Sequence, residues 1–196
     1  MKSRIEKCMK SAAENYTSVF QNDNLKANIQ QIVAKSVTAF QSDKKMLFCG
    51  NGGSASDAQH IAAELSGRFY TDRPPLYAEA LHVNSSFMTA VANDYGYEAT
   101  YARMVEAAGK KGDILVGIST SGNSPNVVNA IRKANELGMK TVGFTGKNGG
   151  AMKDICDIMI CTPSDDTPRV QEVHILVGHI ICQLIEQEMF LSLIHI

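Results

Sequence analysis

The chain has 196 residues, 44% of them hydrophobic and 20% charged, which is typical of one globular domain. Its 19 basic and 20 acidic residues give a formal net charge of −1, so nothing in the overall charge favours binding to nucleic acid or to an acidic membrane. The sequence contains no apolar run of about 18 residues and no apolar signal segment near its start, which predicts a cytoplasmic protein. Five scattered cysteines without a CxxC pair are typical of reduced thiols.

Two amphipathic helices are predicted within residues 1–42. Apolar side chains recur there at three- and four-residue spacing on both sides of a polar break at residues 22–24. Both helices precede every predicted strand. We therefore expect them to pack on the outside of the domain or at a subunit interface.

From residue 45, short apolar runs alternate with helical segments. The runs predict five strands, at 46–49, 76–81, 113–119, 141–145 and 158–161, and the last predicted helix covers about 168–190. Apolar strands separated by helices predict an α/β fold, a three-layer sandwich with a five-stranded parallel sheet flanked by helices. No repeat or linker divides the chain, so residues 1–196 are expected to form one domain.

A glycine-rich loop, GNGG at 50–53, follows the first strand. Glycines let a ligand approach main-chain N–H groups closely. Ser54 and Asp57 form a capping pattern that predicts a helix start at Ser54. The loop matches neither the dinucleotide fingerprint nor the P-loop. It indicates either a ligand-binding loop or an ordinary strand-to-helix turn.

A serine-rich loop, STSGNS at 119–124, follows the third strand, and Ser124 with Pro125 is typical of a helix N-terminus. Hydroxyls, free N–H groups and the helix dipole could together bind a phosphate without Lys or Arg. A turn that only caps the helix is the alternative. Ligands of open parallel sheets bind beyond the carboxyl ends of the strands, so we expect both loops at that edge.

Imidazole and carboxylate groups gather on two predicted helices. His60 and Glu64 lie four residues apart on one face, where they could share a metal ion or a proton, or form a plain surface contact. His179 lies among apolar residues, which also fits a structural core histidine. Helical spacing places Glu172 two turns before His179, on the same face, whereas Gln171 is rotated about 80° around the helix from His179. Spacing therefore favours Glu172 over Gln171 as the companion of His179.

Six segments form a recognisable series in chain order: GNGGS at 50–54, AQHIAAEL at 58–65, AND at 92–94, GISTSGNS at 117–124, FTG at 144–146 and RVQEVH at 169–174. Together they resemble the phosphoheptose isomerase family of the sugar isomerase (SIS) domain superfamily. The resemblance covers about residues 5–190. The apolar ending at 191–196 is unlike that family, and His195 is assigned no role.

The resemblance implies an enzyme that converts sedoheptulose 7-phosphate to D-glycero-D-manno-heptose 7-phosphate, for lipopolysaccharide or other surface glycans. It also implies a homotetramer with one zinc ion per subunit. The implied zinc ligands are His60, Glu64, Gln171 and His179, so the family selects Gln171 where spacing favours Glu172. The implied sugar-phosphate contacts are Asn51, Gly52, Gly53, Asn93, Asp94, Ser119, Thr120, Ser121, Ser124 and Gln171.

A mechanism follows from these residue types. Glu64 would be the base that moves a carbon-bound proton, and His179 the acid and base for ring opening and oxygen protonation. Zinc could instead polarise the carbonyl oxygens, and the two roles compete because a metal-bound carboxylate is a poorer base. A non-catalytic relative that binds the DnaA replication initiator keeps both loops but lacks the Glu and the second His. The presence of Glu64 and His179 favours the isomerase.

Overall fold

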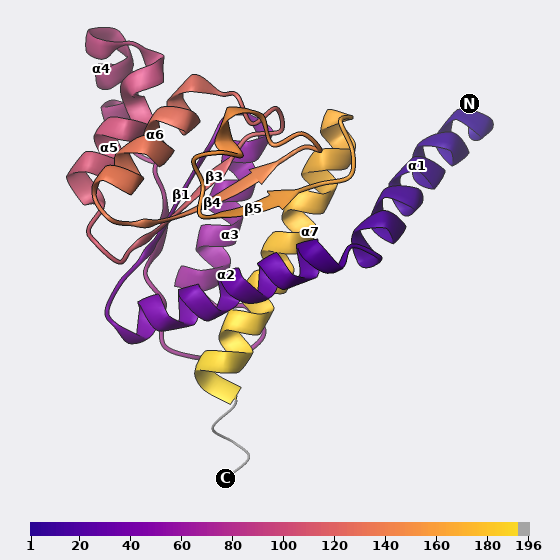
Figure 1. Cartoon of the computed structure of the whole chain (residues 1–196), viewed down its shortest axis with the longest axis horizontal. Helices are drawn as coiled ribbons and strands as arrows, with labels where there is room; N and C mark the ends of the chain where they lie inside the picture. Colours follow the sequence, from indigo (N-terminus) through magenta and orange to yellow (C-terminus); the bar gives the residue numbers. More distant parts are fainter. Residues whose placement is uncertain (192–196) are drawn as a thin grey trace.

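The computed structural model describes residues 1–191, apart from the side chain of Leu191, and His195 lies outside this part. Helices cover both faces of a parallel sheet whose strand order is β2-β1-β3-β4-β5 (Figure 1). This confirms the predicted fold class. The strands are β1 (Met46–Gly50), β2 (Ala78–Ala80), β3 (Ile114–Ile118), β4 (Lys140–Thr145) and β5 (Ile158–Cys161).

Two helices precede β1, and helical segments lie between successive strands. The α-helices are α1 (Lys2–Phe20), α2 (Asp23–Gln41), α3 (Gly53–Ser66), α4 (Ser85–Tyr95), α5 (Thr100–Ala108), α6 (Pro125–Glu136) and α7 (Thr167–Glu186). Short 3-10 turns are formed by η1 (Tyr97–Ala99) and η2 (Gly150–Met152), and a π-helical segment, η3 (Gln187–Leu191), continues α7. Within residues 1–191, no helix combines the length and the apolarity that crossing a membrane requires.

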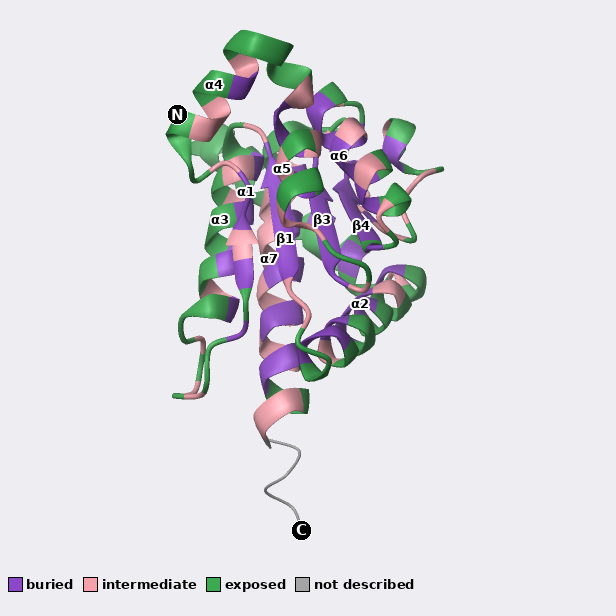
Figure 2. Cartoon of the chain, turned by 90° about the vertical axis from the view of Figure 1, so that its left-hand side faces the viewer, coloured by how far each residue is buried: buried purple, intermediate pink, exposed green. Residues whose placement is uncertain are grey.

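The sheet has a core on each face because successive side chains of a strand point in opposite directions. Met46 and Phe48 of β1 join the apolar cluster formed with α2, α3 and α7, whereas Leu47 and Cys49 join the cluster formed with α5 and α6. Figure 2 shows the buried strands between helices whose outer faces are exposed. Burial on both faces explains why these strands are continuous apolar runs.

The strand order reverses between β1 and β3. The chain passes from β1 to β2 on one side of the sheet and then returns to β3 on the other side of β1. In open α/β sheets such a reversal opens a crevice at the carboxyl ends of the two strands. The glycine-rich and serine-rich loops follow these same two strands.

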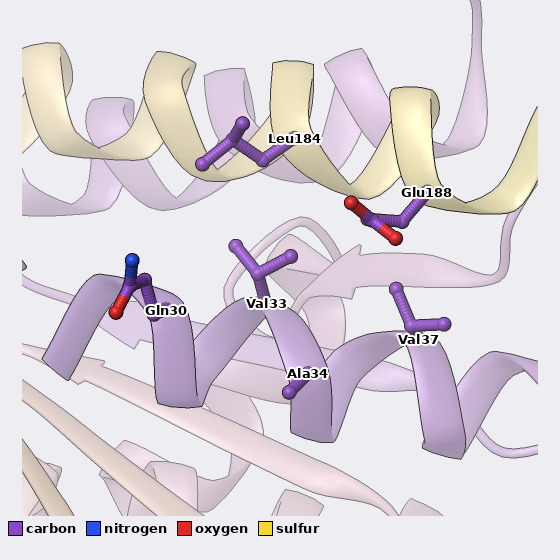
Figure 3. Close-up of a pocket in the computed structure, with 6 residues that line it drawn as sticks. All are labelled: Gln30, Val33, Ala34, Val37, Leu184 and Glu188. Atoms are coloured by element: carbon purple, nitrogen blue, oxygen red, sulfur yellow. The ribbon is translucent and has the colours of Figure 1, made fainter. Parts of the chain in front are cut away.

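The two N-terminal helices lie on the side of the sheet that carries α7. Helix α2 packs against α7 and β5, and the Asn28 side chain donates to the Met159 carbonyl at 2.9 Å. Helix α1 extends outward beyond α2 (Figure 1), and the Arg169 guanidinium donates to its Cys8 carbonyl at 2.8 Å. A groove of about 520 Å³ between α2 and α7 is shown in Figure 3; its lining residues are Gln30, Val33, Ala34, Val37, Leu184 and Glu188.

Candidate active site

The loop after β1 turns sharply into α3. Gly52 is the N-cap and has a φ of 56°, a left-handed conformation that favours glycine. The carbonyls of Asn51 and Gly52 accept from the N–H groups of Ser54 and Ala55, at 3.0 Å each. These bonds close the first turn, so α3 begins at Gly53 and the predicted start at Ser54 is wrong by one residue. Ser54 is buried instead of capping the helix.

Three hydroxyls converge where β3 leads into α6. The buried Ser119 Oγ lies 2.9 Å from Ser124 Oγ and 3.4 Å from the exposed Ser121 Oγ. Ser124 is the N-cap of α6, as predicted. Thr120 lies half-buried beside them. A cluster of hydroxyls at a helix N-terminus has the donors and the dipole that an anion requires.

The two loops are joined by a pair of amides that sequence reasoning missed. Asn126, in the first turn of α6, is buried, and it exchanges two hydrogen bonds of 2.9 Å with Asn51. Tyr97 donates a further bond to Asn51 Oδ1 at 3.0 Å. The only sequence signal for Asn126 was a polar residue beside the serine loop, which does not distinguish a buried amide from an exposed one.

His60, Glu64 and His179 form a cluster between α3 and α7. His60 Nε2 lies 3.0 Å from Glu64 Oε1 and 3.3 Å from His179 Nε2. The His60 side chain is 48% exposed and that of Glu64 24%, so the cluster is open to a ligand. Helix α7 thus brings His179 to a residue that precedes it by 119 positions. His179 is therefore not a core histidine.

The cluster fits a metal ion. One ligand atom from each of the three residues lies within 4.8 Å of the others. Two imidazole nitrogens bound to one zinc ion at about 2.0–2.1 Å, in tetrahedral geometry, would lie about 3.3–3.4 Å apart. The observed 3.3 Å between the His60 and His179 nitrogens matches this separation. Two histidines and a carboxylate are also a ligand set that zinc accepts.

Gln171 and Glu172 face different neighbours. A Cβ atom at Gly53 would lie 2.5 Å from Gln171 Nε2, so the Gln171 amide covers the first turn of α3. Glu172 pairs with Arg169, at 2.6 Å. The helix-spacing argument that favoured Glu172 is not supported by this arrangement, because the Glu172 carboxylate is held by its own helix.

Asn93 and Asp94 lie at the exposed end of α4 and hydrogen-bond to each other at 2.8 Å. Within residues 1–191, no hydrogen bond joins either side chain to the serine loop or to the His60–Glu64–His179 cluster.

Two further side chains border the cluster. Within residues 1–191, the buried Oδ2 atom of Asp57, one turn before His60, has no hydrogen-bond partner. Burial raises the pKa of this carboxyl, while nearby His60 opposes the rise. The Phe69 ring packs against the His179 ring with centroids 5.9 Å apart. Phe69 lies in the irregular segment after α3, where no periodicity could have predicted its contact with α7.

This combination of a doubly wound sheet, a serine loop and a His/Glu/His cluster is matched by known proteins. A family model described as "SIS domain" matches residues 10–146, so the chain is an SIS-domain protein. A phosphoheptose isomerase of Clostridium acetobutylicum is 50% identical over 190 residues, which cover 97% of each chain.

Solved structures agree with this match. A phosphoheptose isomerase from Francisella tularensis has a TM-score of 0.91 at 36% identity, covering 94% of this chain and 97% of that one. One from Neisseria gonorrhoeae has a TM-score of 0.89 at 36% identity, covering 95% and 98%. The chain belongs to the phosphoheptose isomerase family and is an isomerase.

Proposed function

We propose that the protein converts sedoheptulose 7-phosphate to D-glycero-D-manno-heptose 7-phosphate, supplying heptose for lipopolysaccharide or another surface glycan. One observation carries the proposal: a carboxylate, Glu64, and an imidazole, His179, meet across two helices at an open site. These are the groups that a proton-transfer isomerase requires. The names of the relatives, phosphoheptose isomerase, support the substrate class.

The substrate phosphate binds, on this proposal, at the serine loop, where hydroxyls and the N-terminus of α6 provide neutral donors. The glycine-rich loop and the end of α4 contact the sugar. The Asn51 amide is already bonded to Asn126 and Tyr97, which leaves one of its side-chain N–H groups for the substrate. The proposed contact residues are Asn51, Gly52, Gly53, Asn93, Asp94, Ser119, Thr120, Ser121, Ser124 and Gln171.

The reaction moves one proton between neighbouring carbons. Glu64 removes a proton from C1 of the open-chain ketose and returns it to C2, while the carbonyl shifts from C2 to C1 through an enediolate. His179 donates a proton to the oxygen at C2 and accepts one from the hydroxyl at C1, and it assists ring opening. The side chains on α3 and α7 thus share the proton transfers.

His60, Glu64, Gln171 and His179 would hold one zinc ion per subunit, which when bound would polarise the sugar oxygens. This role competes with that of Glu64 as the base, because a metal-bound carboxylate is a poorer base. The separation of the two imidazole nitrogens, 3.3 Å, supports this ligand set. Gln171 is included from the family resemblance, because its amide lies beside Gly53, about two turns of α3 before His60.

A coupled assay on sedoheptulose 7-phosphate tests the assignment. Glu64→Gln and His179→Ala should each lower kcat by about 10²-fold or more, since each removes a proton-transfer group. Glu172→Gln is the matched control on α7 and should keep the wild-type rate, because Glu172 pairs with Arg169. Near wild-type turnover in either test variant would exclude the proposed roles. Zinc content of the purified wild type, compared with His60→Ala, tests the metal, and a wild type without zinc would count against it.

The alternative, a non-catalytic SIS-domain protein that binds DnaA, is not favoured, because Glu64 and His179 are both present. Such a protein would show no turnover and would retain DnaA in a direct binding assay.

We also propose that the chain acts in the cytoplasm as a homotetramer, with residues 1–196 forming one SIS domain per subunit. Exposed apolar residues on one face of α1, among them Ile5, Met9 and Phe20, support a subunit interface built from residues 1–42. The exposed Asn93 and Asp94 would then lie within reach of a neighbouring subunit.

A further inference from the structure

A buried ion pair lies where α3 and α7 end. Arg73 Nε donates to Glu186 Oε2 at 3.1 Å, and the two side chains are 3% and 2% exposed. Neither residue belongs to the proposed catalytic or substrate-binding set. Charges are buried at a high cost unless they are paired and hydrogen-bonded. The partners of this pair therefore indicate which parts of the molecule it holds.

Arg73 binds the carboxyl end of α3. Its Nη2 donates to the Glu64 carbonyl at 2.8 Å, and its Nη1 donates to the carbonyls of Leu65 at 2.7 Å and Gly67 at 3.2 Å. The last carbonyls of a helix have no partner within the helix. The guanidinium therefore caps α3 and contacts the peptide group of Glu64, whose carboxylate lies in the active site.

Glu186 binds the segment that connects α3 to β2. Its Oε1 accepts from the N–H groups of Tyr70 and Thr71, at 3.1 and 3.0 Å. This segment also carries Phe69, whose ring packs against His179. Glu186 lies seven residues after His179, so both lie on the same face of α7, about 10 Å apart along its axis.

We infer that Arg73 and Glu186 are positioning residues of the active site, which fix α3 against α7 and so set the separation of Glu64 and His60 from His179. This inference rests on the proposed function. The cluster has residues on two helices, so its geometry depends on how these helices are held. The Arg73–Glu186 pair joins the end of α3 that bears Glu64 to the face of α7 that bears His179.

Arginine is required at position 73 by this geometry. Its planar fork donates to a carboxylate and to several carbonyls at once, whereas a lysine ammonium is a point charge that could pair with Glu186 but could not reach all these acceptors. Arg73→Lys therefore keeps the charge and removes the cap of α3.

The chain offers a matched control in the residue just before β3. Asp113, 1% exposed, accepts from the N–H groups of Lys45 and Lys110 and from Lys45 Nζ. Glu186 likewise accepts from two main-chain N–H groups and one cation. Asp113→Asn and Glu186→Gln thus remove the same kind of buried charge, but only Glu186 is linked to α3 and α7.

The experiment compares the wild type with Glu186→Gln, Arg73→Lys and Asp113→Asn. For each protein, the melting temperature, kcat and KM on sedoheptulose 7-phosphate are measured, and the zinc Kd is measured by competition with a chelator. We expect both test variants to lower kcat and to weaken zinc binding by about 10-fold or more, since misplaced groups around a metal site cost about 10–100-fold. KM should stay within about threefold because the serine loop is not attached to the pair. Asp113→Asn should lower the melting temperature and leave kcat and zinc affinity unchanged.

Two results would overturn the inference. One is a lower melting temperature in all three variants with kcat and zinc affinity intact. This result would mean that the Arg73–Glu186 pair has only a structural role. The other is an equal loss of kcat and zinc affinity in Asp113→Asn. If Glu186→Gln does not fold, Arg73→Lys decides the same question. A wild type that neither turns over the substrate nor binds zinc would overturn the proposed function, and this inference with it.

Discussion

His174 is the fully buried histidine of the described chain. Its Nε2 donates to the Thr145 carbonyl at 3.2 Å, and its ring packs edge-on against Phe144 with centroids 5.7 Å apart. Burial lowers its pKa to about 4, with the bond to Thr145 opposing the shift. His174 is therefore neutral in the folded protein at neutral pH, and its role is structural.

This burial predicts acid sensitivity. The unfolded chain takes up a proton at His174 near pH 6.5, whereas the folded chain does so only near pH 4, so the free energy of unfolding falls as the pH drops through this window. His174→Gln keeps a donor for Thr145 and removes this titration. Between about pH 7 and about pH 5 the variant should lose about 2 kcal/mol less than wild type in urea unfolding. An equal pH dependence in the two proteins would contradict the prediction.

At the scale of single residues, the sequence predicted which residue types lie at the site but not always which side chains they contact. His60 and Glu64 were predictable as a pair because one helix fixes their spacing. The choice between Gln171 and Glu172 was not predictable, because the direction of a side chain depends on its neighbours. Arg169 pairs with Glu172, and Gly53 leaves room for Gln171. Spacing on a single helix contains no information about either neighbour.

At the scale of elements, α3 and α7 run parallel, side by side. Contacts advance along both helices together, from Gln171 beside Gly53, through Gly178 beside Ile61, to Glu186 near the end of α3. Gly178 lies in the middle of this contact. A Cβ there would lie 2.5 Å from Ile61 Cδ1 and 2.7 Å from Cγ1. The absence of a side chain at Gly178 therefore allows the two helices to approach closely.

Gly178→Ala tests this close approach. Overpacking a core typically costs about 1–3 kcal/mol, and the better helix propensity of Ala returns about 1 kcal/mol, so we expect a net loss of about 1 kcal/mol of stability. Ile61→Val removes the nearest atom and should recover part of the loss. Urea unfolding of the two single variants and the double variant gives the coupling energy. Strictly additive losses would contradict direct packing between these residues.

The elements themselves were largely predictable. The strands predicted at 46–49 and 158–161 lie within one residue of β1 and β5, because each is a continuous apolar run whose side chains pack into the clusters on both faces of the sheet. The segment from 67 to 77 was not predictable in the same way. Arg73 is a charged residue in an irregular stretch, and its burial depends on Glu186, which follows it by 113 residues.

At the scale of the whole molecule, apolar surface remains exposed around the N-terminal helices of the described chain. Ile5, Met9, Tyr16 and Phe20 are exposed along one face of α1, and the groove of Figure 3 lies between α2 and α7. Contiguous exposed apolar surface on a single chain is typical of a protein interface. Residues 1–42 carry much of this surface.

The proposed homotetramer predicts a solution mass of four times the chain mass of 21.3 kDa by light scattering. Phe20→Glu should shift the protein toward smaller species, because it places a charge in the proposed interface. Ser18→Glu, also exposed but on the opposite side of α1, is the control and should keep the wild-type mass. A wild type with the mass of one chain, or equal effects of the two variants, would contradict the assembly.

The separation of His60 and His179 along the chain affects how the protein is made. They are 119 residues apart, and α7 follows all five strands. During translation, the first histidine emerges long before its companion, so an ion shared by both can bind only after the sheet has been synthesised. Metal uptake would then be a late event that stabilises the completed fold by mass action, and it would not guide the nascent chain.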